Sequence, residues 1–145
     1  EIFNEKSIIK DFKKIISRYY NNDLRYLKIK NHPLMTNSKK HKQLTLKLES
    51  VIKSSKNNKI KKDKKKTAIF IGPTTGAIVA LEKNLRVIHI CFDPLFDSYS
   101  QRLWPNLKVS QITKNSFIYK LNKRNSFINF SNSKTCYKKY YEVKK

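Results

Sequence analysis

The sequence is poor in glycine and cysteine, and it has no long apolar run. Only two glycines and two cysteines occur in 145 residues. Cys91 and Cys136 lack the C-x-x-C spacing of zinc and redox sites and indicate no disulfide framework, which fits a reducing, cytoplasmic compartment. No stretch approaches the ~18 continuous apolar residues of a membrane-spanning helix. No signal peptide is recognisable either.

Acidic residues are also scarce. Ten of them face 33 lysines and arginines, a formal net charge of +23. This excess predicts an anionic partner, either a nucleic acid, a membrane surface or a phosphorylated substrate. Only five of the basic residues are arginine, the residue that bidentate readers of bases and phosphates favour. Abundant lysine, isoleucine and asparagine are equally typical of an AT-rich genome, so composition alone leaves both explanations open.

The periodicity of apolar residues predicts helices and strands in alternation. Helical spacing occurs at 5–20, 38–54 (with Ser38 as N-cap) and 74–84 (ending at Asn84). Strand patterns occur at 24–33, 67–72, 86–92 and 106–112, the second and third apolar enough to be buried on both faces. A short helix is expected at 97–105. We therefore expect a nucleotide-binding domain over 1–112 and a polar, basic extension of helix fragments or loose tail over 113–145.

Alternation of this kind predicts an α/β fold, a Rossmann-like parallel sheet flanked by helices. Ligands of such sheets bind beyond the carboxyl ends of the strands. Two loops would lie there. One carries His32 and Pro33, and the other runs from Gly72 to Gly76.

The Gly72–Gly76 loop has the composition of a phosphate cradle. A buried strand ends at Gly72, and a helix with free N–H groups in its first turn begins a few residues later. Thr74 or Thr75 can cap that helix, and Gly76 allows close approach of a ligand or a strand. The P-loop and the GxGxxG fingerprint are both excluded by the glycine spacing. An ordinary capped helix without a ligand is the alternative.

The three histidines have no spacing typical of a metal site, and no metal or cofactor is expected. His32 ends a predicted strand, where an imidazole can donate to a phosphate or protonate a leaving oxygen. His41 lies at a lysine-rich helix start and is expected to be exposed. His89 lies in an apolar strand and is expected to be a core residue.

Together, "KIKNHP" (28–33) and "IGPTTGAIVALEKNLRVIHI" (71–90) resemble the C-terminal, donor-binding half of GT-B-type bacterial glycosyltransferases. The most similar group is that of sialyltransferases, polysialyltransferases and related surface-carbohydrate biosynthesis proteins. These families have an HP motif at a strand end and a Ser/Thr pair that opens a later helix. The resemblance covers residues 24–92, about half of the chain.

The resemblance implies a donor site for a nucleotide-activated sugar, with CMP as a candidate nucleotide. His32 would contact the donor phosphate and assist catalysis. Thr74 and Thr75 would bind the same phosphate, in a site that also includes Pro33, Gly72, Pro73 and Gly76. Glu82 would lie near the ribose. The partners would be the sugar donor, a surface-glycan acceptor and, peripherally, the anionic inner face of the membrane.

The sequence departs from this family in two ways. The pair is Thr-Thr after Pro73, where Ser-Ser or Thr-Ser is usual, and 145 residues hold no N-terminal half with its catalytic base. Because the first residue is Glu1, we expect a fragment of a longer enzyme, which binds a nucleotide but does not transfer sugar by itself. A small RNA- or ribosome-associated protein is the main alternative, with nucleic acid as the less favoured partner. A non-enzymatic accessory protein that keeps the nucleotide fold is the third.

Overall fold

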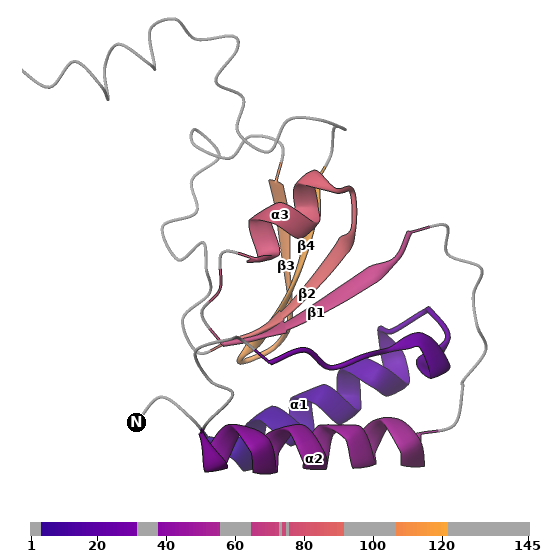
Figure 1. Cartoon of the computed structure of the whole chain (residues 1–145). Helices are drawn as coiled ribbons and strands as arrows, with labels where there is room; N and C mark the ends of the chain where they lie inside the picture. The colour runs from indigo at the N-terminus through magenta and orange to yellow at the C-terminus, as the bar shows by residue number, and fades with distance from the viewer. Residues whose placement is uncertain are drawn as a thin grey trace, which may run out of the picture.

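The computed structural model describes residues 4–31, 38–55, 65–72, 74, 76–91 and 107–121. They form a four-stranded sheet with α1 and α2 packed on one face and α3 on the other (Figure 1). In chain order the elements are α1 (Glu5–Arg18), η1 (Leu24–Tyr26), α2 (Lys39–Ser54), β1 (Thr67–Ile71), α3 (Gly76–Glu82), β2 (Arg86–Ile90), β3 (Leu107–Thr113) and β4 (Ser116–Leu121). The predicted α/β fold with a helix-flanked sheet is confirmed at this level.

The sheet is mixed, so the prediction of a parallel sheet is wrong for the two pairings that β4 makes. The strand order is β1-β2-β4-β3, and β1 pairs with β2 in parallel. Strand β4 is antiparallel to both β2 and β3. Its direction follows from the short turn at Lys114 and Asn115, since a hairpin joins antiparallel strands and a parallel pair needs a long crossover.

Helices α1 and α2 lie on one face of the sheet, as their apolar spacing predicts. Asn4 caps α1 by accepting a hydrogen bond from the Ser7 N–H, and Ser38 caps α2 by accepting one from the His41 N–H. The buried side chains of the two helices meet β2 residues Ile88 and Ile90 in one apolar core. The N-cap predicted at Ser38 is therefore confirmed.

Helix α3 covers the opposite face. Its buried side chains, Ala77, Ala80 and Leu81, pack with Val87 of β2 and Tyr119 of β4. The helix ends as predicted at Asn84, which has the left-handed φ of 59°. The N–H of Leu85 donates a hydrogen bond to the Ala80 carbonyl and so completes this end of the helix.

Residues 24–31 are not a strand, which corrects the sequence prediction. Leu24–Tyr26 is a 3₁₀ turn, and residues 27–31 have no ladder pairing. The alternation was real, since Leu27 and Ile29 pack against the core while Lys28 and Lys30 are exposed. Alternation of apolar and polar residues shows that one side of a segment is buried, but it does not show that the segment pairs with a neighbouring strand.

The start of β1 is held by the side chain of Asn22. Its amide nitrogen donates to the Lys65 carbonyl at 3.3 Å, and its oxygen accepts from the Thr67 N–H at 2.9 Å. This side chain makes the two backbone hydrogen bonds that a neighbouring strand would otherwise supply. Strand β1 is also the edge of the sheet, and its residues are half-buried, not fully buried as predicted.

Strand β4 is the element that the sequence did not predict. The expected helix fragments or loose tail after residue 113 are wrong for Ser116–Leu121, which lies between β2 and β3. The helix predicted at 97–105 and the remainder of the chain from 122 lie outside the described residues. Among the helices that the structure describes, none has the length and apolar character needed to cross a bilayer.

Candidate functional site at the carboxyl edge of β1 and β2

Gly72 ends β1 in a conformation that favours glycine. Its φ is +80°, a left-handed value that an L side chain adopts only with strain. Both of its backbone groups are held by β2. The Gly72 N–H donates to the Ile90 carbonyl at 2.8 Å, and the Gly72 carbonyl lies 2.8 Å from Nε2 of His89. The turn that leaves the sheet is therefore anchored at its first residue.

Thr74 and Gly76 open α3. The Thr74 hydroxyl oxygen accepts a hydrogen bond from the Gly76 N–H at 3.0 Å and so satisfies the first N–H of α3. A Cβ on Gly76 would meet the ring of Phe70 at 3.0 Å and the Thr74 hydroxyl at 3.1 Å. Gly76 is therefore required for helix–strand packing. Because the Thr74 oxygen is the acceptor in its bond, the O–H of Thr74 can still donate.

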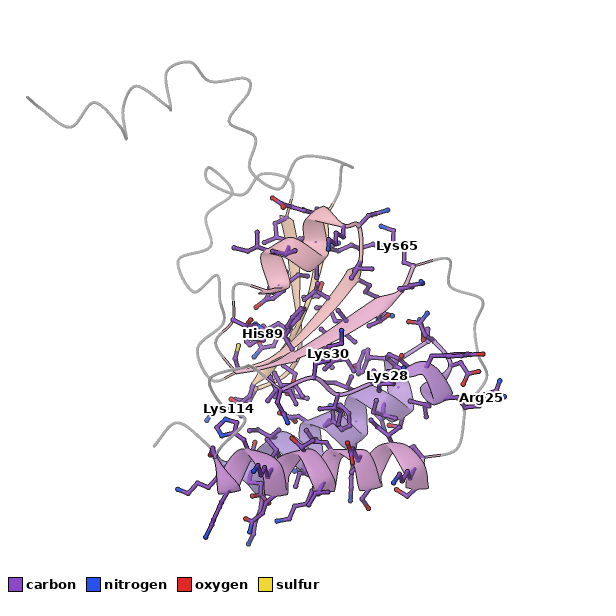
Figure 2. The ribbon with its side chains drawn as sticks, in the orientation of Figure 1. Arg25, Lys28, Lys30, Lys65, His89 and Lys114 are labelled. Atoms are coloured by element: carbon purple, nitrogen blue, oxygen red, sulfur yellow. The ribbon has the colours of Figure 1, made fainter. Side chains whose placement is uncertain are left out.

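His89 lies beneath this turn and is fully buried, as expected for a core histidine. A carbonyl oxygen can only accept, so Nε2 carries the proton that is donated to Gly72. The other nitrogen, Nδ1, lies 3.0 Å from the Tyr119 hydroxyl oxygen and accepts a hydrogen bond from that hydroxyl. The two rings meet edge to face, with centroids 5.7 Å apart. His89 therefore connects the turn after β1 to β4 (Figure 2).

The burial of His89 predicts a pH-dependent stability. Burial lowers its pKa from 6.5, and the hydrogen bond to the Gly72 carbonyl offsets part of this shift. In the unfolded chain the ring takes up a proton at a higher pH than in the folded chain. The free energy of unfolding should therefore fall as the pH drops below about 6.5, by up to ~1.4 kcal/mol per pH unit, until the folded-state pKa is reached.

Urea unfolding of the wild type between about pH 8 and pH 5 measures this slope. His41→Gln is the matched control, because His41 is only half-buried at the start of α2, and it should keep the slope of the wild type. A stability that is constant or rises on acidification would contradict the assignment.

The structure brings three of the predicted site residues together, Gly72, Thr74 and Gly76. Pro73 and Thr75 in the same loop, like His32 and Pro33, lie outside the described residues. Glu82 is exposed at the far end of α3, about 9 Å along the helix axis from Gly76 at the usual rise per residue. A ribose contact by Glu82 stays a prediction.

The approach of His32 to the threonine pair also stays a prediction. It was argued from a strand that would carry His32 to the same sheet edge as Gly72. The residues before it, through Asn31, form no strand. Neighbouring strand ends therefore do not place His32 beside Gly72.

Two residues of this edge were not recognised as part of a site. His89 was identified as buried, but its hydrogen bond to Gly72 depends on a carbonyl 17 residues earlier. Tyr119 lies in the segment expected to be a tail, and its register opposite Val87 brings it to His89. Apolar residues at Phe117, Tyr119 and Leu121 were the available signal. No cluster that could hold a metal ion occurs within the described ranges.

Comparisons with known proteins identify no relative. No family model matches the chain, and no curated protein or solved structure matches it significantly. The candidate site therefore depends on the geometry around Gly72 and on the motif resemblance noted in the sequence.

Proposed function

We propose that this chain is the donor-nucleotide-binding part of a GT-B-type glycosyltransferase. In this proposal the site holds the phosphate of a nucleotide-activated sugar, with CMP as a candidate nucleotide, and the complete enzyme transfers the sugar to a surface glycan. The acceptor side and the catalytic base would belong to a second half. The enzyme would act in the cytoplasm, where its donor is available.

One observation carries the proposal, the turn at Gly72 within the parallel β1–α3–β2 unit. It lies at the carboxyl end of a parallel strand, which is where α/β sheets bind their ligands. Both backbone groups of Gly72 are bonded to β2, so the loop that follows starts from a fixed position. Preorganisation of this kind lowers the entropic cost of binding.

The chemistry that this loop offers is donation to an oxyanion. Backbone N–H groups at the start of α3 and the O–H of Thr74 would bind the phosphate, and Thr75 would add a second hydroxyl. His32, by the family resemblance, would neutralise the departing nucleotide. Catalysis in the complete enzyme would then depend on stabilising the charge that develops on the leaving phosphate.

Calorimetric titration of the chain with CMP and UDP tests this function. We expect saturable binding that Thr74→Ala weakens by about tenfold, the value of one hydrogen bond to a charged group. His32→Ala should weaken it similarly. Thr45→Ala is the matched control, because Thr45 bonds to Asn31 and the His41 carbonyl on the α2 side, and this variant should bind like the wild type.

Two outcomes would overturn the proposal. One is the absence of nucleotide binding. The other is binding that Thr74→Ala and Thr45→Ala leave equally unchanged. RNA binding that falls steeply with salt and shows no nucleotide preference would favour the RNA-associated alternative instead.

A further inference from the structure

The strongest unexplained feature is the charge at the end of the molecule opposite the Gly72 turn. At this end α1 and α2 terminate, η1 follows α1, and β1 begins (Figure 1). Asn22 ties the two chain segments together there through its bonds to Lys65 and Thr67. Figure 2 shows Arg25 and Lys65 at this end and His89 at the other.

Basic side chains of α1, η1 and α2 and of the segment before β1 lie at this end. Lys13, Lys14 and Arg18 of α1 line an open groove of about 580 Å³ together with Ser54 and Ser55 of α2. We call the following set the basic end: Lys13, Lys14, Arg18, Arg25, Lys53 and Lys65. Two acidic residues lie in this part of the described chain. Asp23 forms an ion pair with Arg25 at 2.7 Å, and Glu49 lines a neighbouring groove together with Lys53, so the six cations still outnumber the carboxylates.

The most lysine-rich stretch of the sequence is attached to the basic end. Residues 55–66 contain seven lysines and one aspartate. Both flanks of this stretch are anchored at the basic end, because the Ser55 N–H bonds to the Val51 carbonyl in the last turn of α2 and the Lys65 carbonyl bonds to Asn22.

Favourable interaction of cations with the C-terminal ends of the helices explains only part of this charge. Cations in the last turns of α1 and α2 offset the partial negative charge of the helix C-termini, which explains Arg18 and Lys53. Arg25 and Lys65 lie outside the α-helices of the described chain and need another explanation.

The groove is not built to bind a single phosphate. The hydroxyls of Ser54 and Ser55 both donate to the Val51 carbonyl, and the Ser17 hydroxyl donates to the Lys14 carbonyl. Because these hydroxyl protons already form hydrogen bonds with helix carbonyls, the lysine and arginine side chains are the donors that remain for a phosphate. The arrangement therefore suits a diffuse anionic surface with many phosphates.

We propose that the basic end docks onto an anionic membrane surface through lipid phosphate headgroups. Tyr26 supports a bilayer, because its side chain is 77% exposed beside Arg25 and an aromatic ring with a polar hydroxyl suits the headgroup region. A single-stranded nucleic acid is less favoured. Its binders combine a groove with several stacking aromatics and use arginine, whereas here the exposed aromatic is single among the described residues and the cations are mainly lysines.

This docking orients the molecule. With the basic end on the bilayer, His89, which bonds to the Gly72 carbonyl, lies at the opposite end of the molecule (Figure 2). The inference stands independently of the proposed nucleotide site, since the two surfaces share no residue.

Vesicle co-sedimentation with the full chain tests the inference. We expect binding to equimolar phosphatidylcholine–phosphatidylglycerol vesicles, no binding to phosphatidylcholine alone, and weakening by added salt. The triple variant Lys13→Gln, Lys53→Gln, Lys65→Gln should lower the affinity roughly 100-fold. Tyr26→Ser, which alters no charge, should cause a smaller loss.

The matched control removes the same charge from the other end of α2, as Lys39→Gln, Lys40→Gln, Lys42→Gln. We expect it to lower vesicle affinity by less than about fivefold. Equal losses in the two triple variants would show that net charge alone drives binding and would overturn the inference. So would a wild type that ignores anionic vesicles, or one that binds a single-stranded RNA oligonucleotide through the basic end more tightly than it binds vesicles. Circular dichroism of each variant confirms the native fold, because the substituted side chains lie at the surface.

Discussion

His89→Ala should lower the free energy of unfolding by about 3–5 kcal/mol. The substitution removes a fully buried ring and leaves a cavity between β1, β2 and β4. It also removes the donor to the Gly72 carbonyl and the acceptor of the Tyr119 proton, and each lost buried hydrogen bond adds about 1 kcal/mol. Urea unfolding at pH 8 measures the loss under conditions where the ring is neutral in both states.

His41→Ala provides the control for this prediction, because the same side chain is removed from a half-buried position at the start of α2. It should cost no more than about 1 kcal/mol. Tyr119→Phe removes only the hydroxyl and should cost about 1 kcal/mol. A loss below about 1 kcal/mol for His89→Ala would mean that the turn at Gly72 does not depend on the histidine.

Leu48→Ala should cost about 3–4 kcal/mol, the second of the two largest effects. Leu48 is 3% exposed and belongs to the core that α1, α2 and β2 share. Truncation removes buried apolar surface and leaves a cavity that the surrounding helices and sheet fill only partly. The midpoint of urea unfolding would shift to lower concentration with little change in slope.

Leu46→Ala is the natural control, since the same substitution is made two residues away on the same helix. Leu46 is 65% exposed, and its loss should change stability by less than about 0.5 kcal/mol. Comparable losses at both positions would show that α2 does not present the Leu48 face to the sheet.

The helices were largely predictable because their signals are local. Ile8, Phe12 and Ile15 recur at helical spacing, and Ser38 occupies a cap position. The end of α3 at Asn84 follows from the tolerance of asparagine for a left-handed φ. Each of these signals is contained within a few residues, so no knowledge of the remaining chain was needed.

Three of the four strands were predictable, and the strand expected at 106–112 forms as Leu107–Thr113. Thr67–Ile71 and Arg86–Ile90 were found from their apolar runs. Ser116–Leu121 was missed because the short apolar run of Phe117, Ile118 and Tyr119 lies in a segment that is otherwise polar and rich in asparagine, serine and lysine. Residues 24–31 show the reverse case, in which an alternating pattern is present but no strand forms. Leu24–Tyr26 is a 3₁₀ turn, and the side chain of Asn22 forms hydrogen bonds with the backbone of Lys65 and Thr67 at the start of β1.

The candidate site was half predictable. Gly72, Thr74 and Gly76 were identified from composition, because a glycine and a capping hydroxyl between a strand and a helix have a local meaning. Of the two roles expected for Gly76, the structure supports the close approach of a strand, since a Cβ there would meet the Phe70 ring of β1 at 3.0 Å.

By itself, then, the amino-acid sequence determined the helices, the strands β1, β2 and β3 and the turn after β1, because backbone preference and side-chain periodicity act over a few residues. Tertiary structure alone decided the direction of β4, the edge position of β1 and the bond between His89 and Gly72. These depend on which distant segments pair, and pairing is selected by the burial and hydrogen bonding of the whole sheet. The basic end illustrates both levels, since its lysines are visible in the sequence while their meeting at one end of the fold required the helices, η1 and β1 to pack together.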